Sequence, residues 1–224
     1  MTNIVLKAEN LTKKYENVTE PILRSVNLDV YEGDFISILG ASGSGKSTLL
    51  SILGGMETAS SGAVYFENTN LCLLKEKELS KLRRTKLGFV FQFFNLAPYL
   101  TVKENILLPL MLDGKSLKKY EKRYEELTDY LSITELKDKL PGFLSGGEQQ
   151  RVAIARGLIY EPKIIFLDEP TGNLDSRSAE EIMLLLKKIN AEMKTTILQV
   201  THSEQNASFG NRIVRITDGK LSEE

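Results

Sequence analysis

The feature that most constrains this chain is a glycine-rich loop between two apolar segments. Residues 40–47 read Gly-Ala-Ser-Gly-Ser-Gly-Lys-Ser, which fits the pattern G-x-x-x-x-G-K-[ST]. The preceding residues, 35–39, form an apolar run of strand length, and residues 47–53 favour a helix. A strand, a loop of this composition and a helix, in that order, indicate an α/β protein whose loop lies at the end of a buried strand.

The composition of the loop indicates what it binds. Glycines let successive backbone N–H groups turn towards an anion, and the helix that follows adds its positive N-terminus. Lys46 is expected to reach the β- and γ-phosphates of a nucleotide, and the Ser47 hydroxyl to take a place on Mg²⁺. The alternative is a flexible Gly/Ser turn without a ligand. The residues expected to contact the nucleotide are Gly40, Ala41, Ser42, Gly43, Ser44, Gly45, Lys46, Ser47 and Thr48.

Further apolar runs predict the rest of a sheet. Residues 87–91, 163–167 and 196–200 are apolar almost throughout, without the alternation of a half-exposed strand. Such runs are typical of a parallel sheet that is covered by helices on both faces. Residues 4–6 and 22–30 instead indicate a β-rich N-terminal part. We therefore expect an α/β fold with a P-loop NTPase core and an N-terminal antiparallel β subdomain.

The middle of the chain is predicted to be helical. Residues 117–131 are charged and amphipathic, and residues 146–160 form a second long helix candidate. Another helix is expected from Ser178, which with Glu181 makes the pattern of a capping box. These helices indicate a helical subdomain inserted into the core.

The expected organisation is one domain over residues 1–224. Residues 1–92 and 161–224 would form the β subdomain and the core, and residues 93–160 the helical subdomain, with approximate boundaries.

Composition limits the partners of the chain. Its 29 Lys and Arg residues are balanced by 30 Asp and Glu residues, for a net charge of −1, so we expect no nucleic acid held by a basic surface. The single cysteine, Cys72, favours a reducing compartment. The sequence begins without the pattern of a secretory signal and has no apolar stretch of about 20 residues. We expect a soluble, cytoplasmic chain that would need another protein to act across a membrane.

A second glycine-containing segment narrows the choice among phosphate-binding proteins. Residues 144–150 read Leu-Ser-Gly-Gly-Glu-Gln-Gln. Ser145 is predicted to cap a helix with Glu148 as its capping-box partner. That pattern does not explain Gly146 and Gly147, because glycine in a helix costs up to about 1 kcal/mol relative to alanine. Close approach of the backbone to an anion would justify the cost.

At this point the sequence resembles the ABC ATPase family, whose signature motif is LSGGQ, with Glu148 at the fifth position here. The resemblance extends over essentially the whole chain. Further family motifs follow in the expected order: Gln92 as the Q-loop, residues 164–169 as Walker B, residues 173–175 as the D-loop and His202 as the switch histidine. The resemblance implies a P-loop ATPase core with an inserted helical signature subdomain.

The resemblance also implies roles for the acidic and histidine side chains. Asp168 would hold the Mg²⁺ shell, Glu169 would be the general base that polarises the attacking water, and His202 would contact the γ-phosphate and the water. Lys46 and these two catalytic groups, Glu169 and His202, form the expected catalytic set. A solvated strand end is the alternative for the Asp-Glu pair, and a structural role is the alternative for the only histidine.

The remaining site residues are assigned through the resemblance alone. Gln92 would join Mg²⁺ and the water network. Tyr15 would stack on adenine, although a tyrosine at a strand end can simply pack in the core. Asp175, in the D-loop segment, would belong to the residues that bind the nucleotide. Ser145, Gly146 and Gly147 would cap the ATP that is bound by a second copy of the chain.

The resemblance implies two partners. Two cassettes would close head to tail around two ATP molecules. A homodimer is the simplest form, and a heterodimer with a related cassette remains open. Residues 93–102, rich in aromatic side chains, would border the groove that receives an integral membrane permease, or else be core residues of the helical subdomain. The chain would then be a peripheral protein on the inner face of the cell membrane.

The cargo is not specified by these motifs. Residues 93–102 and 172–176 most resemble the subclass that releases lipoproteins, exports macrolides or handles antimicrobial peptides. We therefore expect export or extraction of peptides, antibiotics or lipoproteins. The alternatives are a cell-division ATPase that transmits conformational change without transport, and a soluble ABC machine such as an iron–sulfur scaffold.

Overall fold

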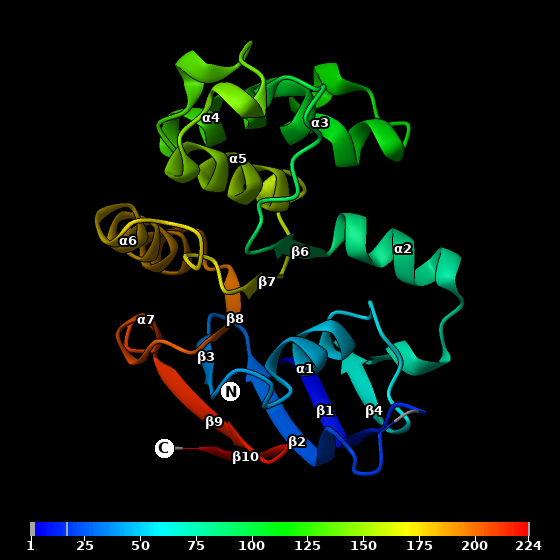
Figure 1. Ribbon diagram of the computed structural model, residues 1–224. Coiled ribbons are helices and arrows are strands. Elements are labelled where there is room, and N and C mark those ends of the chain that lie inside the picture. The colour runs from blue at the N-terminus through cyan, green and yellow to red at the C-terminus, as the bar shows by residue number, and fades with distance from the viewer. Residues whose placement is uncertain (1–2, 17, 224) are drawn as a thin grey trace.

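The computed structural model describes residues 3–16 and 18–223, which fold into two sheets and a set of helices (Figure 1). The strands are β1 (Ile4–Lys13), β2 (Leu23–Tyr31), β3 (Phe35–Leu39), β4 (Ser61–Phe66), β5 (Thr69–Asn70), β6 (Leu87–Val90), β7 (Ile164–Asp168), β8 (Thr196–Thr201), β9 (Arg212–Thr217) and β10 (Lys220–Glu223). The α-helices are α1 (Lys46–Leu53), α2 (Glu76–Thr85), α3 (Val102–Leu112), α4 (Glu121–Tyr130), α5 (Gly146–Leu158), α6 (Ser176–Met193) and α7 (Glu204–Ala207). Short 3-10 helices lie at Leu71–Leu73, Leu117–Tyr120, Thr134–Leu136 and Pro141–Phe143.

The central sheet has the strand order β10-β9-β3-β8-β7-β6. Strands β9, β3, β8, β7 and β6 are parallel, and β10 pairs antiparallel with β9. All five residues of β3 are buried, because the sheet is covered on both faces. The parallel sheet predicted from the apolar runs is confirmed, and β3 has the predicted bounds.

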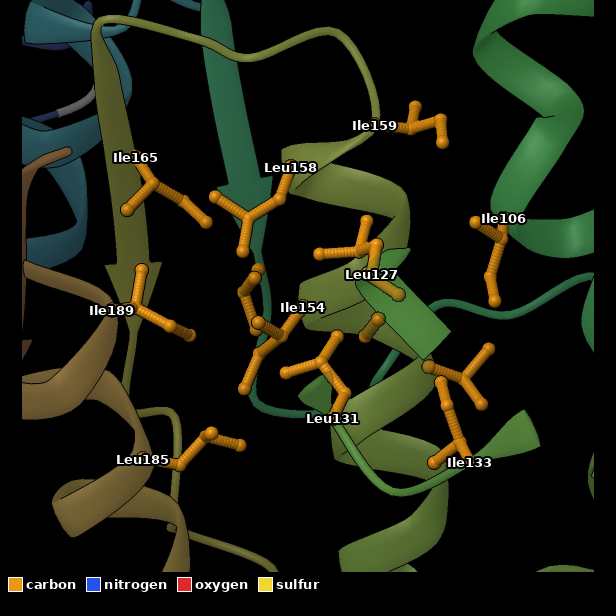
Figure 2. Packing of buried hydrophobic residues seen from close by; sticks show 14 of the residues in the cluster. Ile106, Leu127, Leu131, Ile133, Ile154, Leu158, Ile159, Ile165, Leu185 and Ile189 are labelled. Carbon is orange, nitrogen blue, oxygen red and sulfur yellow. The ribbon is translucent and has the colours of Figure 1, made fainter. Parts of the chain in front are cut away.

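The two faces of this sheet support two separate hydrophobic clusters. On β7, Ile164 and Phe166 pack with α1 on one side, whereas Ile165 and Leu167 pack with α5 and α6 on the other. The side chains alternate because successive residues of a strand point to opposite faces. Figure 2 shows Ile165 opposite Leu158 of α5, in the cluster that also contains the helices of the middle of the chain.

The second sheet is antiparallel, with the order β2-β1-β4-β5. Its buried residues share a cluster with α1, so this helix lies between the two sheets. Leu49, Leu50, Ile52 and Leu53 are the side chains through which α1 packs. The antiparallel subdomain that we expected is therefore present and supports the helix that follows the glycine-rich loop.

Helices α3, α4 and α5 lie together at one end of the molecule (Figure 1). Their buried side chains include Ile106, Leu127 and Ile154, which pack in one cluster (Figure 2). The inserted helical subdomain is confirmed, while its boundaries at about residues 93 and 160 stay a prediction. Within the described residues no helix combines the length and the apolar character needed to cross a bilayer.

Candidate active site

The glycine-rich loop occupies the turn between β3 and α1. Its last glycine, Gly45, is the N-cap of α1 and has a φ of 99°, a conformation that side chains other than glycine rarely adopt. Gly40 has no room for a side chain, because an added Cβ would lie 2.7 Å from the carbonyl oxygen of Ile216. The two glycines therefore let the backbone turn tightly against β9 before the helix begins.

The Lys46 side chain reaches back from the end of this loop to its beginning. Its side chain is buried, and its Nζ donates hydrogen bonds of 2.9 Å to the carbonyl oxygens of Gly40 and Ala41. A cationic group held beside a loop of backbone N–H groups is suited to a polyphosphate.

A cavity of about 790 Å³ opens over residues 40–44 of the loop. This volume falls within the range of small-molecule sites, roughly 300–1,000 Å³. His202 also lines it, together with Val18, Pro21 and Ile22 from the turn before β2. We did not predict these last three residues, and no sequence pattern marks them, since pairing of β1 with β2 brings them to the loop.

Ser47 and Asp168 meet at the edge of the sheet where β7 ends. The Ser47 hydroxyl donates a 3.0 Å hydrogen bond to Oδ1 of Asp168. Burial raises the pKa of the Asp168 carboxyl, and the neighbouring charge of Glu169 adds to the rise. A hydroxyl and a partly desolvated carboxylate are hard oxygen donors, so these residues fit Mg²⁺, which usually binds one or two carboxylates together with substrate phosphates.

Glu169 and His202 form a second pair beside the first. Strands β7 and β8 are neighbours with Asp168 opposite Val200, so the residues that follow each strand lie close together. His202 Nδ1 lies 3.0 Å from Glu169 Oε1. Glu169 is largely buried, whereas His202 is mostly exposed and faces the cavity. This pair could hold a water molecule next to a bound phosphate and accept its proton.

Gln92 is placed beside the D-loop. It follows β6, and its Nε2 lies 3.5 Å from Oδ1 of Asn173, while Asn173 Nδ2 donates a 2.9 Å hydrogen bond to the Gln92 carbonyl. An added Cβ on Gly172 would lie 2.8 Å from Gln92 Nε2, so the side chain is closely packed there. Among the described residues no hydrogen bond joins Gln92 to Ser47 or Asp168, so its predicted place on Mg²⁺ stays a prediction.

The signature segment caps α5. The Ser145 hydroxyl accepts from the Glu148 N–H at 3.3 Å, and the Glu148 carboxylate accepts from the Ser145 N–H at 2.7 Å. This reciprocal pair is the predicted capping box. Gly146 packs against Leu174, whose Cδ2 would lie 3.0 Å from an added Cβ, so close packing within the chain gives a further reason for this glycine. The cavity beside Lys46 is lined by none of Ser145, Gly146 and Gly147.

Asp175 has a structural position that we did not predict. It is the N-cap of α6, and its Oδ1 accepts from the N–H groups of Arg177 and Ser178 at 3.1 and 3.0 Å. Hydrogen bonds from Ser178 hold the pKa of the Asp175 carboxyl below its usual value. The predicted capping box of Ser178 and Glu181 is wrong, because the helix already begins at Ser176 and Asp175 satisfies its first N–H groups.

Tyr15 lies just after β1 and outside the lining of the cavity. Lys13 Nζ is 4.7 Å from the centre of its ring. Burial alone would raise the pKa of Glu57, but hydrogen bonds from Tyr15 and Lys13 lower it overall. Stacking of Tyr15 on adenine therefore stays a prediction; in this structure Lys13 lies over the ring and the side chain of Tyr15 hydrogen-bonds to Glu57.

Comparison with known proteins agrees with this geometry. The family model described as "ABC transporter" matches residues 23–172. The chain is 46% identical to the lipoprotein-releasing system ATP-binding protein LolD of Aquifex aeolicus, over 97% of this chain and 96% of the relative. It is 43% identical to the bacitracin export ATP-binding protein BceA of Halalkalibacterium halodurans, over 97% of this chain and 87% of the relative.

A solved structure is similar over nearly its whole length. It is the dimeric structure of a post-hydrolysis state of the ATP-binding cassette MJ0796, from Methanocaldococcus jannaschii, bound to ADP and Pi. Its TM-score is 0.87 at 45% identity, over 98% of this chain and 97% of that chain. Together with the loop, the cavity and the acidic sheet edge, these similarities show that the chain belongs to the ABC transporter family, as an ATP-binding subunit that hydrolyses ATP.

Proposed function

We propose that this chain is the motor of a membrane exporter, in which two copies close around two ATP molecules and drive a separate permease. The observation that carries the proposal is the pair Glu169 and His202, 3.0 Å apart beside the cavity over the glycine-rich loop. The similarity to proteins named for bacitracin export and lipoprotein release supports export or extraction of peptides, antibiotics or lipoproteins. Those relatives are named for export or release, which favours transport over the cell-division alternative.

In this proposal each group of site residues has a separate chemical role. The backbone of residues 40–48 and the Lys46 ammonium hold the phosphates, the ammonium leaving the carbonyl oxygens that it contacts in this structure. Glu169 accepts the proton of the attacking water, and His202 orients that water and the γ-phosphate. Ser47, Asp168 and Gln92 would hold Mg²⁺, which neutralises phosphate charge when bound.

The site is completed by a second copy. Ser145 and Gly147 present a hydroxyl and an N–H group at the N-terminus of α5, where an anion is favoured, but they do not line the cavity of their own chain. A twofold dimer would place them on the ATP of the partner. Asp175, at the start of α6, would lie at the contact between the two copies.

The partner in the membrane would dock on the helical end of the molecule. A groove of about 450 Å³ lies between β6 and α3 and is lined by Phe89, Phe91 and Leu112. In the segment that follows Phe91, Phe93 and Tyr99 are 71% and 90% exposed, while Phe94 packs into the core. The segment 93–102 is therefore partly core and partly an exposed apolar surface, and the exposed part supports its proposed place at the permease contact. With a permease there, the chain would sit on the cytoplasmic face of the membrane.

The experiment that tests the chemistry is Glu169→Gln. Loss of the general base should lower ATP turnover by about 100-fold or more, while binding of ATP is kept. The exposed Glu180 of α6 offers a matched control, and Glu180→Gln should leave turnover unchanged. If Glu169→Gln turned over ATP at the normal rate, the proposed role of the pair would be wrong.

The same variant tests the transport partner. Tagged Glu169→Gln, captured from native membranes with ATP present, should bring a polytopic membrane protein that mass spectrometry identifies. Adding Leu112→Asp in the groove should abolish this capture, whereas Leu184→Asp, at an exposed apolar side chain of α6, should not. Recovery of soluble partners only, with none from the membrane, would contradict the transporter proposal.

A further inference from the structure

A partly buried hydrogen bond joins the segment after Glu169 to the segment after His202. Thr171 lies two residues beyond Glu169, and Asn206 is in α7, four residues beyond His202. Asn206 Nδ2 donates a 2.7 Å hydrogen bond to Thr171 Oγ1. The two segments that supply the Glu169–His202 pair are therefore connected at a second point.

Asn206 itself is held by the central sheet. Its carbonyl oxygen accepts a 2.9 Å hydrogen bond from Nε2 of Gln199, a fully buried residue of β8. The same Nε2 donates to Ser37 Oγ of β3 at 2.7 Å, and Ser37 Oγ donates to the carbonyl oxygen of Ala207 at 2.9 Å. Because α7 is tied to two strands, the position of the Asn206 amide is fixed relative to the sheet.

The other side of the loop is held by α5. Gln150 is fully buried and donates a 2.6 Å hydrogen bond from Nε2 to the Pro170 carbonyl oxygen. Residues 170 and 171 are thus held from two directions, by the signature helix and by α7. This matters because Glu169 has a φ of 47°, a left-handed conformation that a non-glycine residue keeps only when its surroundings impose it.

We infer that the hydrogen bond between Asn206 and Thr171 is a positioning link for hydrolysis. It keeps the Glu169 loop and the His202 segment in register, so that the carboxylate and the imidazole stay 3.0 Å apart beside the cavity. Asn206 and Thr171 act through Glu169 and His202 and do not touch the nucleotide. The inference rests on the proposed roles of those two residues.

The link is tested by removing either side of it. Asn206→Leu and Thr171→Val, which keep the approximate side-chain shapes, should each lower kcat for ATP by about three- to tenfold, the value of one neutral hydrogen bond expressed in the transition state. KM should change less than about twofold, because ground-state contacts remain. The double variant should be no slower than the slower single variant. Thr171→Ser, which keeps the hydroxyl, should recover at least about half of the wild-type kcat.

A control variant at another side-chain amide, Asn190, distinguishes a loss of positioning from a general loss of stability. Asn190 donates from Nδ2 to the carbonyl oxygens of Gly33, Asp34 and Thr195, which precede β3 and β8, whereas the catalytic pair follows the opposite ends of β7 and β8. Asn190→Leu should lower the thermal midpoint but leave kcat near the wild-type value at temperatures where the protein is folded. A kcat loss in Asn190→Leu equal to that in Asn206→Leu, or additive losses in the double variant, would overturn the link. Unchanged kcat in both single variants, with Glu169→Gln inactive, would overturn the link alone and leave the proposed function standing.

Discussion

Glu148 occupies the fifth position of the signature segment, where the family motif has glutamine. Its Oε2 accepts hydrogen bonds from the Ser145 N–H at 2.7 Å and from the Ser145 hydroxyl at 2.8 Å. These bonds, the backbone one first, hold the pKa of the Glu148 carboxyl below its usual value of 4.5. The charged form is therefore the one that stabilises the start of α5.

The direction of this shift predicts how acid affects the fold. Because the native pKa is lowered, the contribution of Glu148 to stability is present above about pH 4.5 and is lost as the pH falls through the native pKa. Glu148→Gln keeps an acceptor for the Ser145 N–H but no longer titrates. Thermal midpoints measured from pH 7 to pH 3 should fall about 1–2 °C less in this variant, since the carboxylate is largely solvated. A steeper fall than in the wild type would contradict the assignment.

At the scale of secondary structure, the predictable elements are those whose own residues form a recognisable apolar or capping pattern. The core strands were predicted because burial on both faces makes them apolar throughout, as in β3. Strand β4 was missed, since it takes its place from pairing with β1 rather than from its own pattern. Helix α2 was missed because it is mostly charged and buries only Leu79. The cap of α6 was misplaced because Asp175 and Ser178 both satisfy the local pattern of an N-cap.

The same reasoning explains the site. Glu169 and His202 were assigned to one site through the family resemblance, and their 3.0 Å approach results from the pairing of β7 with β8. The contacts of Gln92 with Asn173 could not be predicted, because they join residues 81 positions apart and depend on how the helical part packs on the core. The link of Asn206 to Thr171 had no motif to mark it.

Helix α3 supports the exposed segment before it through its own cap. Thr101 accepts from the Glu104 N–H at 3.2 Å, and Glu104 accepts from the Thr101 N–H at 2.7 Å. Thr101→Ala should lower the free energy of unfolding by about 1 kcal/mol, as loss of an N-cap does. Urea unfolding measures this, and Thr101→Ser should restore it. At the end of α2, among the residues that the structure describes, the Thr85 hydroxyl bonds only to the Lys81 carbonyl oxygen in the same helix, so Thr85→Ala should cost less than about 0.5 kcal/mol. Equal losses of unfolding free energy in Thr101→Ala and Thr85→Ala would contradict the predicted contribution of the α3 cap.

At the scale of the whole molecule, the two halves of the proposed site, the glycine-rich loop and the signature segment, lie on different parts of the fold. The loop leads into α1, which begins at Lys46 and lies between the two sheets, whereas Ser145 caps α5 at the helical end (Figure 1). No signature residue lines the cavity beside Lys46. If the signature acts on the nucleotide of another copy, a copy with a damaged signature and a copy with a damaged loop should together form one intact site. This could not happen if both halves of a site came from the same chain.

Two inactive variants should therefore restore activity when mixed. Ser145→Arg blocks the signature with a large cation, and Lys46→Ala removes the phosphate contact, so neither homodimer has an intact site. In a mixed dimer, the intact loop of the first variant meets the intact signature of the second, and the other site is damaged twice. Equal mixing makes about half of the dimers mixed, so turnover should recover to about a quarter of the wild-type value if the sites are independent. If both sites must be intact for turnover, the mixed dimer should still trap one ATP when Glu169→Gln is added to both chains. A mixture that neither hydrolyses nor traps ATP would place the signature and the loop of one site in the same chain.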